Sequence, residues 1–172
     1  MSKLIFTGIT ILSSFLALKI CGFMVNTSAS LPLGVYREAG SIERGGFALF
    51  CLEDEGFIKL AQERGYLGKG ECPGGIKPLG KKIFGLAGDE ISFPRGADGE
   101  IAVDGQIIER SSAKSEDSRH RGLPASHLTA GRIPEGFALM LSSHHAGGFD
   151  SRYFGLVKVS ALTPVQPVFT WE

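Results

Sequence analysis

The stretch NTSASLPLGVYREAG, Asn26 to Gly40, joins an apolar segment to the first strand that the sequence predicts. Pro32 biases Leu31 toward an extended backbone, and Gly34 permits a turn. Ser30 is therefore presented on a stiff, non-helical backbone just after the apolar segment. A nucleophile needs this kind of fixed exposure, although serine-rich turns beside proline and glycine are also common without any catalytic role.

The segment before this stretch, Leu4 to Val25, is almost entirely apolar or small and holds a single charged residue. At about 1.5 Å per residue, a helix of this length can cross a hydrocarbon core of about 30 Å. Lys3 favours a cytoplasmic N-terminus. We therefore expect a membrane anchor over residues 1–25 and one exported domain over residues 26–172. The alternative is a secretory signal peptide that is cleaved after Ala29.

The composition indicates one β-rich folded unit. A chain of 172 residues is long enough for one domain with a core. Its 24 glycines and 8 prolines favour short strands and turns over a helical bundle. With 18 basic and 18 acidic side chains there is no net charge, which argues against a nucleic-acid partner.

One helix of appreciable length is expected in the exported body. Apolar residues recur at helical spacing between Phe57 and Tyr66, behind an acidic start, and Gly65 or Gly68 supplies a stop. Residues 111–124 are polar and without periodicity, which predicts a solvated surface loop. The predicted strands lie in residues 34–40, 45–52, 76–93, 94–109, 136–143 and 153–162, with hairpin signals at Asp98-Gly99 and Asp104-Gly105.

The three cysteines divide by context. Cys51 and Cys72 lie in the expected exported body and can form one disulfide in an oxidising compartment, with two free thiols as the alternative. Cys21 lies in the apolar segment and is most simply a small buried hydrophobe. No CxxC motif occurs, and His144 and His145 form an isolated pair, so the sequence suggests neither a metal nor a cofactor.

A serine nucleophile needs a base, and the chain offers two kinds. In a strand, Lys81 and Lys82 point to opposite faces, so one can be buried while the other stays in solvent. Burial lowers a lysine pKa from about 10.4, as a general base at neutral pH requires. The competing base is a histidine paired with Asp150. The histidines are His120, His127, His144 and His145.

A further polar group stands among aromatic residues in the stretch GGFDSRYFG. Asp150 and Arg152 lie between Phe149 and Tyr153, so each is expected to have a specific partner. One interpretation is a network that supports a site, and the other is a structural ion pair that caps a strand.

The motifs SASLPLG, KKIFGLAGD and FDSRYFG follow the apolar segment in this order, with ERGYLGKGECPGG between the first two. In this combination the chain resembles the type I signal peptidases, and more closely their TraF-type branch, the peptidases of conjugative transfer systems. The resemblance implies a mainly β fold with signal-peptidase-like coiled sheets and one short inserted helix, behind an N-terminal transmembrane helix. It also implies a single span in the bacterial inner membrane, with the catalytic domain in the periplasm.

The resemblance assigns roles to five residues. Ser30 matches the nucleophile and Lys81 the general base of a Ser/Lys dyad. Ser28 matches the residue whose hydroxyl joins the Ser30 backbone N–H in the oxyanion hole. Asp150 matches the acidic residue that supports the site, and Arg152 belongs to the same motif. The implied substrate is a polypeptide precursor of the pilin type, with contacts to conjugation machinery, and ring closure by an amine of the same polypeptide is a hypothesis from the family.

The sequence departs from the family at Gly148. Housekeeping signal peptidases have a serine at this position, and it helps to orient the lysine. Some other group has to orient Lys81 here, and the candidates are Ser143, His145 and Asp150.

Two other classes of function stay open. A Ser/Lys autoprotease of the LexA type shares the dyad, but such a protein carries a DNA-binding head where this chain has an apolar segment. A non-catalytic, membrane-tethered assembly subunit of a secretion or conjugation apparatus would keep the fold without needing a base.

Overall fold

The computed structural model describes residues 22–96, 99–142 and 145–171. Among these residues no helix has the length and apolar character that crossing a membrane requires. Most of the expected anchor, including Cys21, lies outside the described residues. Its last three residues belong to strand β1 (Phe23–Asn26), so the β structure begins before the expected boundary at Asn26.

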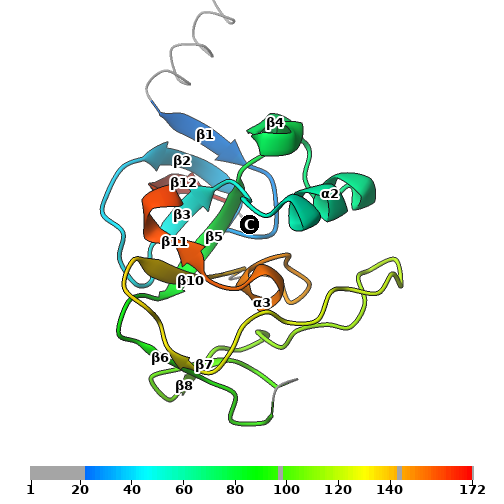
Figure 1. Cartoon of the computed structure of the whole chain (residues 1–172). Coiled ribbons are helices and arrows are strands. Elements are labelled where there is room, and N and C mark those ends of the chain that lie inside the picture. Colours follow the sequence, from blue (N-terminus) through cyan, green and yellow to red (C-terminus); the bar gives the residue numbers. More distant parts are fainter. Residues whose placement is uncertain (1–21, 97–98, 143–144, 172) are drawn as a thin grey trace, which may run out of the picture.

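Seven strands form one antiparallel sheet, in the order β1-β2-β12-β3-β5-β10-β11 (Figure 1). Besides β1, they are β2 (Gly34–Glu38), β3 (Phe47–Phe50), β5 (Leu79–Gly85), β10 (Phe137–Leu141), β11 (Val157–Lys158) and β12 (Thr163–Thr170). Burial alternates along β5, as expected for a strand with one face in the core.

A smaller sheet of four strands has the order β8-β7-β6-β9. Its strands are β6 (Glu90–Ser92), β7 (Ala102–Val103), β8 (Gln106–Ile107) and β9 (Gly131–Arg132). The hairpin between β7 and β8 turns at Asp104 and Gly105, with φ of 50° and 77°. Positive φ at both positions is what a tight two-residue hairpin requires, so this prediction is confirmed. Asp98, from the other predicted turn, lies outside the described residues.

The predicted helix is α2 (Glu55–Arg64), and its ends follow from two residues. The Asp54 carboxylate accepts a hydrogen bond of 3.0 Å from the Phe57 N–H and caps the N-terminus. Gly65 ends the helix with φ of 67°, so the stop is Gly65 rather than Gly68. After α2 the chain continues through β4 (Lys69–Cys72) and a 3-10 turn (Pro73–Gly75).

The expectation of a single helix was wrong, because Ser151–Phe154 form a second, one-turn helix, α3. The Asp150 side chain accepts a hydrogen bond from the Arg152 N–H and starts this turn. The strand predicted over residues 153–162 is consequently reduced to β11, followed by a 3-10 turn over Val159–Ala161.

The last strand, β12, was not predicted, because Pro164 and Pro167 argue against a strand inside a sheet. The structure places it between β2 and β3. Its register against β2 shifts between Pro167 and Phe169, and such an irregularity relaxes the ladder where a proline lacks an N–H.

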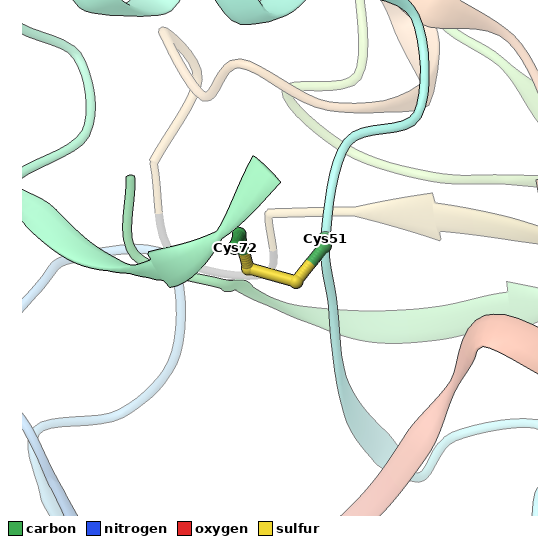
Figure 2. Close-up of a disulfide and its surroundings, with 2 residues drawn as sticks. All are labelled: Cys51 and Cys72. Carbon is green, nitrogen blue, oxygen red and sulfur yellow. A yellow bond between two sulfur atoms is a disulfide. The ribbon is translucent and has the colours of Figure 1, made fainter. Parts of the chain in front are cut away.

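A disulfide ties the segment that contains α2 and β4 to the large sheet (Figure 2). It joins Cys51, which directly follows β3, to Cys72 at the end of β4, with the two Cα atoms 5.5 Å apart. This is the pair that the sequence singled out. Figure 1 shows α2 and β4 on the opposite side of the molecule from the small sheet.

Candidate functional site

Asn26, at the end of β1, holds the loop that carries Ser30. Its side chain is buried, and its Nδ2 donates hydrogen bonds to the carbonyl oxygens of Ser28 (2.9 Å), Leu31 (3.1 Å) and Pro32 (3.0 Å). Its Oδ1 accepts from both the N–H (3.1 Å) and the hydroxyl (2.8 Å) of Ser28. This role of Asn26 was not predicted from the sequence, although an asparagine at the start of a serine- and proline-containing turn is a known signal of side-chain to backbone bonding.

The loop packs directly onto β5. Leu31 is buried, and a Cβ atom at Gly80 would lie only 2.9 Å from the Leu31 Cδ1. The Tyr36 hydroxyl donates a 2.8 Å hydrogen bond to the Pro32 carbonyl and fixes the other end of the loop. Leu31 thus packs against β5 at Gly80, and the preceding residue, Ser30, lies next to the Lys81 side chain.

Lys81 points inward from β5; the alternation of the strand predicted that one of the two neighbouring lysines would do so, and the resemblance singled out this one. Its side chain is buried, and its Nζ donates hydrogen bonds to the Ser30 Oγ (2.9 Å) and the Ser142 Oγ (2.8 Å). Lys82 points to the other face, where its Nζ lies 5.2 Å from the centre of the Phe84 ring. Of the two neighbouring lysines, the structure therefore brings Lys81 to Ser30.

The environment of Lys81 favours its neutral form. Burial lowers its pKa from 10.5 to about 8; the charge of Asp150 opposes this shift and that of Arg152 adds to it. With a pKa of about 8, about one tenth of the Lys81 side chains are neutral at pH 7.

Ser142, which directly follows β10, is the second partner of Lys81, and it is none of the three groups that the sequence suggested. Its backbone N–H donates a 2.9 Å hydrogen bond to the Asp150 Oδ2, so Asp150 acts on Lys81 through its charge and through Ser142. His145 is exposed beside the cleft described below. Ser143, like His144, lies outside the described residues.

Asp150 and Arg152 form a fully buried ion pair, with Oδ1 and Oδ2 each 2.7 Å from a guanidinium nitrogen. Arg152 also donates to the carbonyl oxygens of Gly148 (3.0 Å), Ala146 (2.5 Å) and Ser112 (3.2 Å). The two interpretations of these residues are therefore compatible: the pair is structural, and it also holds the backbone around Ser142 and Gly148.

A cleft of about 580 Å³ runs past Ser30 and Lys81. Its lining is mainly apolar and includes Met24, Ala29, Leu49, Leu67, Leu79 and Phe149. A largely apolar cleft of this size beside a hydroxyl and a buried amine can hold a peptide segment.

The loop over residues 111–124 lies at the surface, as predicted, and it also contributes residues to the lining of this cleft. Asp117 fixes the loop: its Oδ2 accepts hydrogen bonds from the Tyr66 hydroxyl (2.6 Å) and the Arg121 Nε (2.7 Å). Burial by itself would raise the pKa of Asp117, but the hydrogen bonds from Tyr66, Arg121 and Arg119 hold it well below its usual value. Tyr66 follows α2, so the loop is fastened to the disulfide-bonded segment.

Two histidines that the sequence offered as alternative bases, His120 and His127, pair with residues other than Ser30. The His127 ring packs against Phe57, with ring centres 5.3 Å apart, and the exposed His120 pairs with Glu116 at 3.3 Å. Asp150, the expected partner of a catalytic histidine, is engaged by Arg152. Within residues 22–96, 99–142 and 145–171, no group of three or more His, Cys, Asp or Glu side chains is arranged to hold a metal ion.

Comparison with known proteins places the chain in a family. The family described as signal peptidase, peptidase S26, matches residues 8–171. The chain is 33% identical over 152 residues to the plasmid transfer protein TraF of Escherichia coli, covering 87% of this chain and 84% of that protein. It is 35% identical over 157 residues to the conjugal transfer protein TraF of Agrobacterium fabrum, covering 89% and 85%.

Among solved structures, a signal peptidase I from Enterococcus faecalis superimposes with a TM-score of 0.40 at 18% identity, over 74% of this chain and 97% of that one. The family match extends over nearly the whole chain, and the identity to the TraF proteins exceeds 30% over most of both sequences. The chain therefore belongs to the signal peptidase family, peptidase S26, in its TraF branch.

Proposed function

We propose that this chain is a membrane-anchored serine endopeptidase in which Ser30 is the nucleophile and Lys81 the general base. One observation carries the proposal: the buried Lys81 Nζ lies 2.9 Å from the Ser30 Oγ, with a pKa of about 8. Acyl transfer by a serine requires a base within hydrogen-bonding distance of the hydroxyl, with a pKa near the working pH. Membership of a peptidase family supports the same reaction class.

The reaction begins when neutral Lys81 takes the proton of the Ser30 hydroxyl, whose oxygen attacks the carbonyl carbon of the scissile peptide bond. The tetrahedral intermediate collapses as the Lys81 ammonium gives its proton to the departing amine, leaving an ester on Ser30. Lys81 then takes a proton from water, whose oxygen attacks the ester and releases the second product.

The oxyanion is held by the Ser30 backbone N–H and the Ser28 hydroxyl. The Ser28 hydroxyl donates to the Asn26 Oδ1, so it has to rotate away from Asn26 before it can donate to an oxyanion. Each such donor contributes on the order of 3 kcal/mol to transition-state stabilisation.

The substrate we propose is an exported polypeptide precursor, specifically the pilin precursor of a conjugative transfer system. The similar proteins are named for plasmid and conjugal transfer, which supports this choice. The apolar residues 4–21, which precede β1, suit a single span of the bacterial inner membrane, with the peptidase domain in the periplasm beside other transfer components. The Cys51–Cys72 disulfide fits that oxidising compartment.

Two products are compatible with an ester on Ser30. Water as acceptor gives a linear peptide, whereas the amine of the same polypeptide as acceptor gives a ring that is lighter by one water. The product mass distinguishes them, and a linear product alone would exclude ring closure.

The test is cleavage of a membrane-inserted, pilin-like precursor by the purified full-length wild type and its Ser30→Ala, Lys81→Ala and Lys82→Ala variants. We expect cutting by the wild type and Lys82→Ala only, with a rate that rises toward about pH 8 as Lys81 loses its proton. Cleavage by a folded Ser30→Ala or Lys81→Ala protein at the wild-type rate would refute the proposal.

A further inference from the structure

We infer that Ser142 is the positioning residue that aims the Lys81 amine at Ser30. This inference rests on the proposed function, because it assigns a role within that reaction. Ser142 was not among the residues predicted from the sequence, and its hydroxyl lies 2.8 Å from the Lys81 Nζ.

The hydrogen-bonding capacity of the amine explains why a second partner matters. A protonated lysine has three N–H donors, and both Ser30 and Ser142 accept from it. After losing one proton, the amine keeps two N–H groups and gains one lone pair, and this lone pair must face the Ser30 hydroxyl to take its proton. A hydrogen bond kept to the Ser142 Oγ fixes one N–H and thereby turns the lone pair toward Ser30.

The backbone of Ser142 is itself held in place. Its N–H donates to the Asp150 Oδ2 at 2.9 Å, and Asp150 is fixed in turn by the buried Arg152. Because this contact uses the Ser142 N–H, removing the side-chain hydroxyl leaves it in place.

Gly148 supplies an independent geometric argument. A side chain at this position would begin with a Cβ 2.5 Å from the Ser142 Cβ and would collide with the Ser142 Oγ. The two positions therefore share one small space beside the Lys81 Nζ, and only one of them can fill it. This chain fills it from position 142, which explains why a glycine at position 148 is compatible with an oriented lysine.

The first test compares the full-length Ser142→Ala protein with the wild type, using the precursor assay above over a range of pH. We expect kcat to fall by about 10- to 100-fold, as misaligned reacting groups produce, with KM and the melting temperature unchanged. The rising limb of the pH profile should move to lower pH, because the ammonium form has lost an acceptor. A Ser142→Thr protein keeps the hydroxyl and should lose less activity than Ser142→Ala.

The second test moves the hydroxyl across the shared space. Gly148→Ser alone should be damaging because of the collision, and Ser142→Gly alone should lose the hydroxyl. The double variant Ser142→Gly/Gly148→Ser removes the collision and leaves a Cβ 2.9 Å from the Asp150 Oδ2, which a small shift relieves. We expect it to be more active than either single variant, a non-additive result that independent sites would not give.

The outcomes separate this inference from the proposed function. If Ser30→Ala and Lys81→Ala are inactive while Ser142→Ala keeps the wild-type kcat, the role of Ser142 is refuted and the dyad stands. A loss of activity in Ser142→Ala that matches a loss of folded protein would also refute it, as would a folded double variant no better than Ser142→Gly. Full activity of Lys81→Ala would overturn both proposals.

Discussion

Replacing Lys81 by methionine should make the protein inactive. It should also remove a pH-dependent loss of unfolding free energy that the wild type has at neutral pH. Burial holds the pKa of Lys81 at about 8 in the folded protein, against 10.5 for a solvated lysine. The unfolded chain therefore binds the proton more tightly, so the stability contributed by Lys81 is present above about pH 10.5 and is lost as the pH falls through about 8. A pKa difference of about 2.5 corresponds to about 3.4 kcal/mol in total.

The variant Lys81→Met also loses its hydrogen bonds to Ser30 and Ser142, but that loss does not depend on the ionisation of Lys81. The pH-dependent part is thus isolated by following the difference in unfolding free energy between the two proteins. Between about pH 6.5 and about pH 9.5, the wild type should gain about 2 kcal/mol relative to Lys81→Met.

The assay is denaturant unfolding of the full-length proteins, with the disulfide intact, at a series of pH values. Lys82→Met controls for removing one lysine side chain from the same strand. The contrary result is a difference in unfolding free energy between wild type and Lys81→Met that stays constant over this pH range. That result would show that the pKa of Lys81 is not lowered in the folded protein, and the argument for Lys81 as a general base near neutral pH would fail.

Two further predictions concern the walls of the cleft. The double variant Cys51→Ser/Cys72→Ser removes a disulfide between residues 21 apart in sequence and should lose about 3 kcal/mol of unfolding free energy. The loss is measured by urea denaturation, with the reduced wild type as a comparison. An unchanged denaturation midpoint would contradict this prediction. Asp117→Asn removes the ionised acceptor that fastens residues 111–124, so limited proteolysis should cut this loop faster than in the wild type or in a Glu116→Gln control. Equal cleavage rates would show that Asp117 does not hold the loop.

Local patterns in the sequence were enough to predict much of the secondary structure. Helix α2 could be placed because its N-cap, apolar spacing and terminal glycine are all encoded within a dozen residues. The alternation of β5 likewise predicted that Lys81 and Lys82 lie on opposite faces, and the structure decided that Lys81 is the inward one. Strand β12 could not be predicted in the same way, because Pro164 and Pro167 oppose a strand locally and only its neighbours β2 and β3 stabilise it.

For the site, the three motifs and their order determined which residues were candidates: Ser28, Ser30, Lys81, Asp150 and Arg152. Only the tertiary structure decided which of these side chains are in contact. It places Lys81 within hydrogen-bonding distance of Ser30, and it shows that Asn26 holds the loop of Ser30 and that Ser142 is the second partner of Lys81. The physical reason is that the lysine pKa and the direction of its amine depend on burial and on hydrogen bonds between strands far apart in sequence. Those contacts form only when β1, β5 and β10 are folded together.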